Sequence, residues 1–212
     1  QIADAGLGVE ALIAEGWTNR ALPSDETVAQ LAGIGRTAKW MTAHACINTW
    51  APDTLRTEIL IAERMGVSQM VVHPYVLGQN VEGHEHSPQE SRDLCRFALD
   101  HGVMLVLENL GMTGIESMRR SVEIIGAEPE KTGMAICIDV GHANRTCTND
   151  GIRPEEYLRE FWDLVREVHI DDNLGTKDLH LPPGQGAIDW PPVLDAMLDL
   201  PEETIVCLEV AW

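Results

Sequence analysis

The feature of this 212-residue chain that most limits its fold is a phrase that recurs along its length. A helix-like segment ends in a glycine and a short apolar run follows, as in "ADAGLGVEAL", "AERMGVSQMVVH" and "LDHGVMLVLEN". Glycine just past a helix is the usual left-handed cap, and an apolar, β-rich run after it predicts a strand. The chain is therefore expected to alternate helices with strands.

This pattern predicts seven strands, and their spacing indicates how they connect. They are expected near residues 7–12, 38–44, 68–73, 103–108, 134–139, 166–171 and 204–209. Successive starts are about 30 to 38 residues apart, which is the length of one βα unit. Strands that are apolar on both faces and joined by helical crossovers belong to a parallel sheet covered by helices.

Seven such repeats favour a barrel over a doubly wound sheet, and no GxGxxG or Walker loop follows any strand. A complete barrel has eight strands. The chain opens in "QIADAG", which is typical of the last turn of a helix, and it stops directly after an apolar strand. We therefore predict an α/β, (β/α)8 TIM-barrel-like fold with seven strands in this chain. Its first strand and last helix are expected to be missing, and residues 1–212 to form a single domain truncated at both ends.

The charge of the chain limits its partners. Thirty-four acidic residues against 15 Lys and Arg give a formal net charge of −19, which argues against nucleic acid or an anionic membrane as a default partner. No apolar run approaches the length of a membrane span, and the start does not resemble a signal peptide. The five cysteines form no CxxC pair, so they are expected to be buried thiols in a reducing compartment. A cytoplasmic protein is expected.

Imidazoles and carboxylates follow the predicted strands, at the end where barrels carry their chemistry. Each one alone has an ordinary explanation, as a hydrogen-bonded histidine or a helix-capping carboxylate. Together they would repel or desolvate one another unless a cation lay among them, so Asp139 and His142 are expected to face a divalent metal. The strand ends and the loops beyond them carry His44, His73, Glu108, Asp139, His142, His169, Asp178, His180 and Glu209.

The segments "VVHP", "VLENL", "CIDVGHAN", "VHIDDNLGTKDLHLPPGQGAIDW" and "CLEV" resemble the xylose isomerase-like TIM-barrel superfamily. That superfamily contains sugar phosphate isomerases and epimerases, and also the type 2 apurinic-site endonucleases. The resemblance implies that one divalent metal is held by Glu108, Asp139, His169 and Glu209. It also implies that Glu108 and Glu209 are catalytic and that His142 is a third catalytic residue beside the substrate.

Further residues are expected around this centre. Additional metal or substrate ligands are sought among His44, His73, Asp178 and His180. Asn109 follows Glu108 directly, and Arg145 and Lys177 are the nearest cations in the strand-end loops. These three are expected to bind the substrate, because cationic and amide side chains hold phosphate or sugar hydroxyls, and the alternative for Arg145 and Lys177 is pairing with the surplus acids.

The predicted chemistry is proton transfer next to a carbonyl group. It needs a base on one face of the substrate, an acid on the other and an electrophile for the developing enediolate. Two glutamates and a metal supply all three. The sequence thus predicts an enzyme, a metal-dependent sugar or sugar-phosphate isomerase or epimerase of carbohydrate metabolism. Mixed carboxylate and imidazole ligation suits Mn²⁺, with Mg²⁺, Co²⁺ and Zn²⁺ as alternatives.

Three other functions stay open from the sequence. One is a related dehydratase or lyase acting on a polyol or keto-sugar. Another is a zinc-dependent phosphodiesterase like the apurinic-site endonucleases, although the acidic chain offers no basic face for DNA. The third is a barrel that binds a metal or sugar without turnover, which paired glutamates disfavour. The expected partner is a small carbohydrate, and a homodimer is left open because exposed strand edges promote association.

Overall fold

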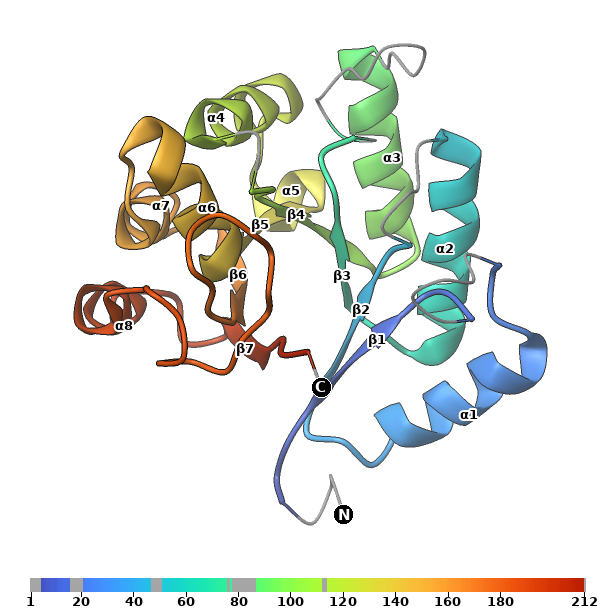
Figure 1. Ribbon diagram of the computed structural model, residues 1–212. Helices are drawn as coiled ribbons and strands as arrows, with labels where there is room; N and C mark the ends of the chain where they lie inside the picture. Colours follow the sequence, from blue (N-terminus) through green and yellow to red (C-terminus); the bar gives the residue numbers. More distant parts are fainter. Residues whose placement is uncertain are drawn as a thin grey trace. The chain divides into compact units, whose positions relative to one another are not determined.

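The computed structural model describes residues 5–15, 21–46, 51–75, 77, 87–111 and 114–211. Strands and helices alternate along this part of the chain (Figure 1). The strand order in the sheet follows the order in the sequence, and the registers of the paired strands are parallel. The predicted seven strands are confirmed. They are β1 (Val9–Leu12), β2 (Met41–His44), β3 (Gln69–Val72), β4 (Met104–Glu108), β5 (Met134–Asp139), β6 (Val165–Ile170) and β7 (Ile205–Leu208).

The helices begin and end at local signals. Ser87 and Glu90 form a capping box before α3, and Pro88 occupies its first turn, where its missing N–H costs nothing. Helix α2 ends at Gly66, whose φ of 75° is left-handed and suits a residue without a Cβ. Within the described residues, no helix is long and apolar enough to cross a membrane. The helices are α1 (Asp25–Gly35), α2 (Pro52–Met65), α3 (Pro88–Asp100), α4 (Gly114–Ile125), α5 (Pro129–Thr132), α6 (Val140–Asp150), α7 (Pro154–Glu160) and α8 (Trp190–Met197).

The chain divides into two compact units. The first consists of residues 1–106 and 124–134, and the second of residues 107–123 and 135–212. In the first unit, β2 pairs with β1 and with β3, while α2 packs against α1 and α3. The expectation of a single domain stays a prediction.

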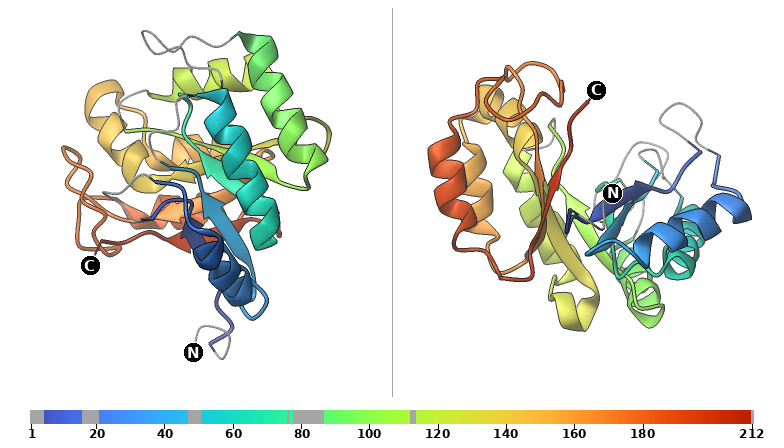
Figure 2. Two further views of the ribbon diagram at one scale, coloured as in Figure 1. Left: turned by 90° about the vertical axis from the view of Figure 1, so that its right-hand side faces the viewer. Right: turned by 90° about the horizontal axis from the view of Figure 1, so that it is seen from below.

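In the second unit, β6 pairs in parallel with β5 and with β7, and α7 packs against α6 and α8 (Figure 2). Every residue of β5 is buried, as expected for an inner strand of a parallel sheet. The register sets Asp139 beside His169, and His169 beside Cys207. The carboxyl ends of three strands therefore meet at one edge, where the polar side chains collect.

Candidate active site

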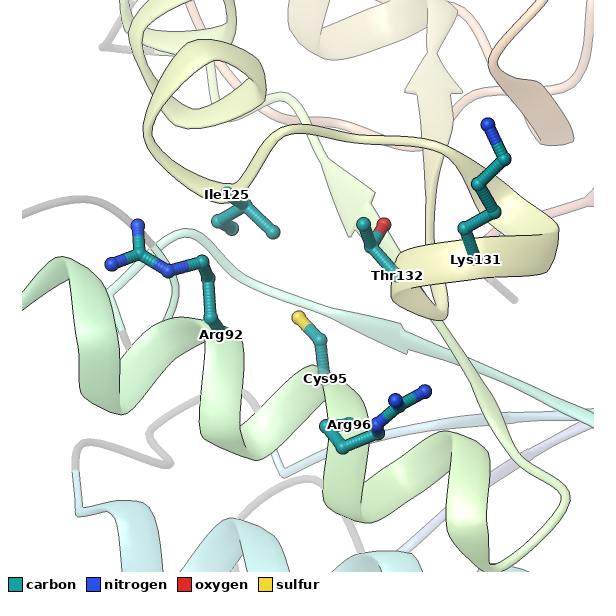
Figure 3. Close-up of a pocket in the computed structure, with 6 residues that line it drawn as sticks. All are labelled: Arg92, Cys95, Arg96, Ile125, Lys131 and Thr132. Atoms are coloured by element: carbon teal, nitrogen blue, oxygen red, sulfur yellow. The ribbon is translucent and has the colours of Figure 1, made fainter.

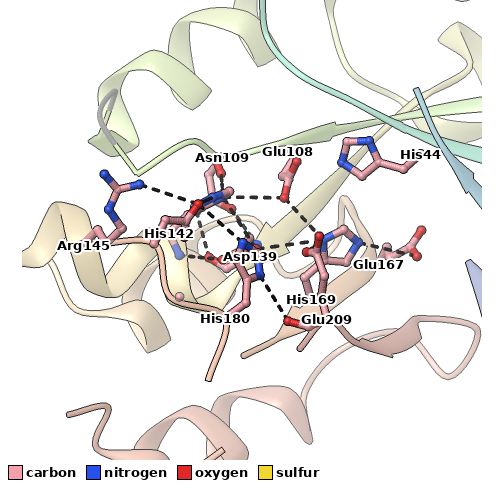
Figure 4. Close-up of polar contacts among 12 residues, drawn as sticks. His44, Glu108, Asn109, Asp139, His142, Arg145, Glu167, His169, His180 and Glu209 are labelled. Atoms are coloured by element: carbon pink, nitrogen blue, oxygen red, sulfur yellow. Dashed lines mark hydrogen bonds and ion pairs between the residues drawn. The ribbon is translucent and has the colours of Figure 1, made fainter. Parts of the chain in front are cut away.

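Four potential metal ligands meet at this edge of the second unit (Figure 4). Glu108 ends β4, Asp139 ends β5, His169 lies on β6 and Glu209 directly follows β7. One donor atom from each side chain lies within 4.8 Å of the donors of the other three. All but Glu209 are buried. The structure thus brings together the four residues that the sequence predicted as a metal site.

The imidazole of His169 lies at the centre of the group. Its Nδ1 is 2.9 Å from Oε2 of Glu209, 3.3 Å from Oε1 of Glu108 and 4.0 Å from Oδ2 of Asp139. Its Nε2 lies 3.8 Å from Oε1 of Glu167, which is longer than a hydrogen bond, so Glu167 places a further negative charge behind the ring while Nδ1 faces the other candidate ligands. The sequence analysis missed Glu167. Its position two residues before His169, on the same face of β6, was the available signal.

The charge of this donor set fits a divalent cation. Oδ2 of Asp139 and Oε2 of Glu209 are buried and accept no hydrogen bond from the described part of the chain. Burial raises the pKa of Asp139 to about 6, with Glu108 and Glu209 adding to the rise and His142 opposing it. Buried carboxylate oxygens that accept no hydrogen bond are costly unless something balances their charge. Three carboxylates and one imidazole suit Mn²⁺, Mg²⁺, Co²⁺ or Zn²⁺.

Asp139 has a second task, because it is also the N-cap of α6. Its Oδ1 accepts a hydrogen bond from the backbone N–H of His142 at 2.5 Å. Asn109 holds the backbone of Asp139 from both sides: its Oδ1 accepts from the N–H at 2.8 Å, and its Nδ2 donates to the carbonyl oxygen at 2.9 Å. The amide of Asn109 therefore positions a candidate ligand, and its predicted role in substrate binding stays a prediction.

His142, Asp178 and His180 form a second group of donors that lie within 4.8 Å of one another. Nδ1 of His142 donates to the carbonyl oxygen of Asn109 at 2.9 Å, and its Nε2 lies 3.1 Å from Oδ2 of Asp178. Burial alone would lower the pKa of His142, but the charge of Asp139 and the hydrogen bond to Asp178 raise it well above its usual value. The hydrogen bond to Asp178 likewise raises the pKa of His180 to about 9.

The backbone of His180 is strained. Its φ of 45° lies in the left-handed region, which a residue with a Cβ rarely adopts. Two hydrogen bonds tie it to the chain after β7: Nδ1 donates to the carbonyl oxygen of Glu209 at 3.1 Å, and the N–H of Ala211 donates to the His180 carbonyl at 2.9 Å. Strain of this kind concentrates at functional sites. The loop that carries Asp178 and His180 is thus fastened beside Glu209.

The predicted substrate-binding cations lie near this second group. Nη1 of Arg145 is 3.8 Å from Oδ2 of Asp178, whereas Lys177 is exposed. Arg145 also borders a cavity of about 340 Å³, a size in the range of small-ligand sites. The binding roles of Arg145 and Lys177 stay predictions. The other residues that line the cavity are Gly111, Thr148, Asn149, Gly175 and Thr176.

The two remaining predicted ligands belong to the first unit. His44 ends β2 and His73 follows β3. Their ring centroids are 5.2 Å apart in an edge-to-face arrangement, and Nδ1 of His44 lies 2.7 Å from the carbonyl oxygen of Ala45. The structure brings these two histidines together, as expected of neighbouring strand ends. Their role as additional ligands stays a prediction.

The sequence from residue 25 to residue 212 matches the family model described as xylose isomerase-like TIM barrel. This chain belongs to that family. The predicted family and fold class are therefore confirmed.

Two curated relatives of this family member are both called uncharacterized proteins. MJ1311 of Methanocaldococcus jannaschii is 29% identical over 126 residues, covering 55% of this chain and 40% of the relative. Protein y4fM of Sinorhizobium fredii is 23% identical over 212 residues, covering 92% of this chain and 64% of the relative. The chain thus spans less than two thirds of the length of either relative.

Solved structures share the fold of this family member. A D-tagatose 3-epimerase-like protein superposes with a TM-score of 0.73 at 21% identity, covering 96% of this chain and 81% of that chain. An L-ribulose 3-epimerase gives 0.72 at 15% identity, covering 99% and 73%. The TTHB071 protein of Thermus thermophilus, from a crystal soaked with ZnCl₂, gives 0.66 at 20% identity, covering 100% and 85%. At these identities the likeness concerns the fold alone.

Proposed function

We propose that this member of the family is a divalent-metal-dependent isomerase or epimerase of a sugar or sugar phosphate. The observation that carries the proposal is the buried donor set in which Glu108 and Glu209 both approach Nδ1 of His169. The epimerase names of two proteins with the same fold support it. When bound, a divalent ion supplies a Lewis acid for the negative charge that develops on the substrate oxygens.

The two glutamates carry the proton transfer. One carboxylate removes the proton from the carbon next to the substrate carbonyl, and the other carboxyl group returns a proton to the opposite face. Return to the same carbon gives an epimer, whereas return to the former carbonyl carbon gives an isomer. Two acid–base groups from separate strand ends are what this exchange requires, and a passive binding site would have no need of the pair.

His142 and Arg145 are proposed to hold the substrate. His142 is fixed between Asn109 and Asp178, which use both of its ring nitrogens. Its raised pKa favours the charged ring, and we propose that its Nε2 exchanges Asp178 for a substrate oxygen when the substrate binds. Arg145 borders the neighbouring cavity of about 340 Å³. A small carbohydrate is the proposed partner, since the net charge of −19 disfavours nucleic acid. Mn²⁺ is the proposed native ion, with Mg²⁺, Co²⁺ and Zn²⁺ as alternatives.

Deuterium uptake from D₂O into a panel of ketoses and their phosphates tests this function. The protein loaded with Mn²⁺ is expected to exchange the proton next to the carbonyl of at least one of these sugars. Glu108→Gln and Glu209→Gln should each slow the exchange by about 10²–10⁴-fold, the usual contribution of a general acid or base. Glu123→Gln, an exposed change on α4, is the matched control and should exchange normally. Undiminished exchange in both site variants would contradict the assignment.

A zinc-dependent phosphodiesterase is the second candidate, and one observation favours it. His142, Asp178 and His180 form a second complete donor group beside the first, and a phosphodiesterase of the apurinic-site type uses more than one zinc ion. Metal analysis of the purified protein separates the two functions. Two or three zinc ions per chain, with phosphodiester hydrolysis and without any deuterium exchange, would replace the epimerase proposal.

A further inference from the structure

A small basic cavity lies in the first unit, between α3 and the segment that leads into β5 (Figure 3). Arg92, Cys95 and Arg96 of α3 form one wall, and Lys131 and Thr132 of α5 lie across from them, with Ile125 at the end of α4. We propose that this cavity binds the phosphoryl group of a small anion, either inorganic phosphate or a phosphate monoester. The proposal does not depend on the function of the strand-end site.

The cavity is lined by positively charged residues, whereas the chain as a whole is strongly negative. Only 15 Lys and Arg are present against 34 acids, yet three of the six lining residues are cationic and none is acidic. Arg92 and Arg96 are four residues apart on α3 and so share one face of the helix. Like charges at this spacing destabilise a helix. Figure 3 shows the two guanidinium groups pointing in opposite directions from the helix, so an anion in the cavity would meet Arg96 directly and would be attracted by the charge of Arg92 from further away.

The hydrogen bonds leave donors available at the cavity. Arg92 is anchored, because Nη1 donates to the carbonyl oxygen of Ile124 at 2.9 Å and Nη2 to Oε1 of Gln89 at 3.1 Å. The guanidinium group of Arg96 makes neither a hydrogen bond nor an ion pair with another residue in the described part of the chain. A planar guanidinium group with its donors available matches the oxygens of a phosphoryl group.

The opposite wall is rigid and carries the third cation. Thr132 Oγ1 donates to the carbonyl oxygen of Glu128 at 3.0 Å and accepts from the N–H of Glu128 at 3.0 Å, which fixes the turn of α5. Lys131 forms an ion pair with Glu128 on this turn and is exposed at the rim. Figure 3 shows its ammonium group pointing away from Cys95 and Arg96, so Lys131 contributes positive charge at the rim and no direct contact to an anion in the cavity.

The volume of the cavity limits the size of its ligand, and the residues at its base limit the charge that it can accept. Its volume of about 160 Å³ equals roughly five water volumes of about 30 Å³ each, below the 300–1,000 Å³ of sites for whole drug-sized molecules. It therefore suits one tetrahedral oxyanion, with the rest of a monoester outside. Cys95 and Ile125 form a buried floor. Burial raises the pKa of Cys95 to about 12, so the thiol stays neutral and does not repel an anion.

Titration calorimetry with inorganic phosphate and with glycerol 3-phosphate, at an ionic strength held constant with NaCl, tests the site on the full chain. One site per chain is expected, with affinity that falls as NaCl is raised. Arg96→Gln should weaken binding at least tenfold, Arg96→Lys less, and Arg96→Glu should abolish it. Arg64→Gln, an exposed change on α2 in the same unit, should bind like the unaltered protein.

The two probes separate the sources of the ligand. Binding of both, with the same loss in the Arg96 variants, supports a site for any phosphoryl group, whereas binding of inorganic phosphate alone supports the free anion as ligand. Thermal unfolding without ligand checks that each variant is folded. Failure of both probes to bind the unaltered protein would overturn the proposal. Binding that Arg96→Gln and Arg96→Glu leave unchanged would also overturn it, because the anion would then lie elsewhere.

Discussion

Two adjacent carboxylates at the end of β6 lie in opposite environments. Asp171 and Asp172 are both fully buried. Asp171 faces the donor groups of the candidate site, and neither of its oxygens accepts a hydrogen bond within the described residues. Asp172 faces the loop that leads to α8, and both of its carboxylate oxygens accept hydrogen bonds. It accepts hydrogen bonds from the N–H groups of Asn173 at 2.8 Å, Gly184 at 2.9 Å and Ile188 at 3.3 Å, and from Nε1 of Trp190 at 3.0 Å.

The pKa values of the two carboxyl groups follow these environments. Burial acts to raise the pKa of Asp172, but its hydrogen bonds outweigh burial and lower it. Burial and the charge of Asp139 raise the pKa of Asp171 to about 8. A buried carboxylate that accepts several N–H groups stabilises the fold, whereas one without them is a cost that persists where a ligand balances it. The number of donors around a strand-end acid therefore separates structural residues from those of the site.

The largest effect is expected at Asp139. Asn is as good an N-cap as Asp, so Asp139→Asn should keep α6 and remove only the ligand charge. We expect metal affinity to fall by about 100-fold or more, since changes even to residues behind the ligands cost 10–100-fold, and activity to be lost. Equilibrium dialysis with Mn²⁺ and circular dichroism measure the two parts. Retained metal affinity would remove Asp139 from the ligand set.

Asp172→Asn should instead act on the fold. The amide group keeps one acceptor but turns an NH₂ toward backbone donors, so we expect a loss of about 3 kcal/mol, since one or two hydrogen bonds to a charged group contribute about 1.5–3 kcal/mol each. Urea unfolding measures this. Asp199→Asn, at an exposed site, is the control and should change little.

The dependence of the unfolding free energy on pH, measured below pH 7, tests the same variant in a second way. Because the folded-state pKa of Asp172 is lowered, its contribution is present above its unfolded pKa of about 3.9 and is lost as the pH falls below that value. The unaltered protein should therefore lose more stability than Asp172→Asn on going from pH 7 to about pH 3. Parallel curves would show that Asp172 contributes no charge-dependent stability.

Two glycines sharpen the comparison, one beside each carboxylate. A Cβ at Gly186 would lie 2.1 Å from Oδ1 of Asp172 and 2.4 Å from the carbonyl oxygen of Asn173, which is fixed backbone. The three atoms nearest to a Cβ at Gly141 all belong to the side chain of Asp171, with Oδ1 at 2.0 Å, and none of them is backbone. Gly186→Ala should therefore cost about 1–3 kcal/mol more than Gly141→Ala. Equal unfolding midpoints would contradict the expected difference between the two glycine positions.

The smallest effect is expected at Asp171, and its sign is opposite. Asp171→Asn removes a buried acid that accepts no hydrogen bond, so the metal-free protein should gain about 0.5–1 kcal/mol. Urea unfolding in the presence of a chelator measures the change. A loss of stability like that of Asp172→Asn would show that the two environments do not differ as described.

The sequence predicted the features that depend on local signals. Glycine caps and buried apolar runs placed all seven strands, and the rule that parallel strands end together placed a larger group of imidazoles and carboxylates at one end. Only the resemblance to the family selected Glu108, Asp139, His169 and Glu209 from that group. The sequence did not predict the hydrogen bonds that anchor Asp172, because their donors lie up to 18 residues further along the chain. The start of α6 directly after Asp139 was also missed. Asp139, which was predicted as a metal ligand, is also the N-cap of α6. A sequence pattern does not show that one side chain has two such roles.

Glu108 ends β4, while Glu209 follows β7, and this order matters during synthesis on the ribosome. A nascent chain that stops before β7 holds Glu108, Asp139 and His169 but lacks the fourth donor. If the proposed ion binds these four residues, its complete set of ligands forms only when β7 has joined β6, so the earlier strands would assemble through their own pairing and burial. Metal binding would then stabilise only those chains in which β7 is already in place.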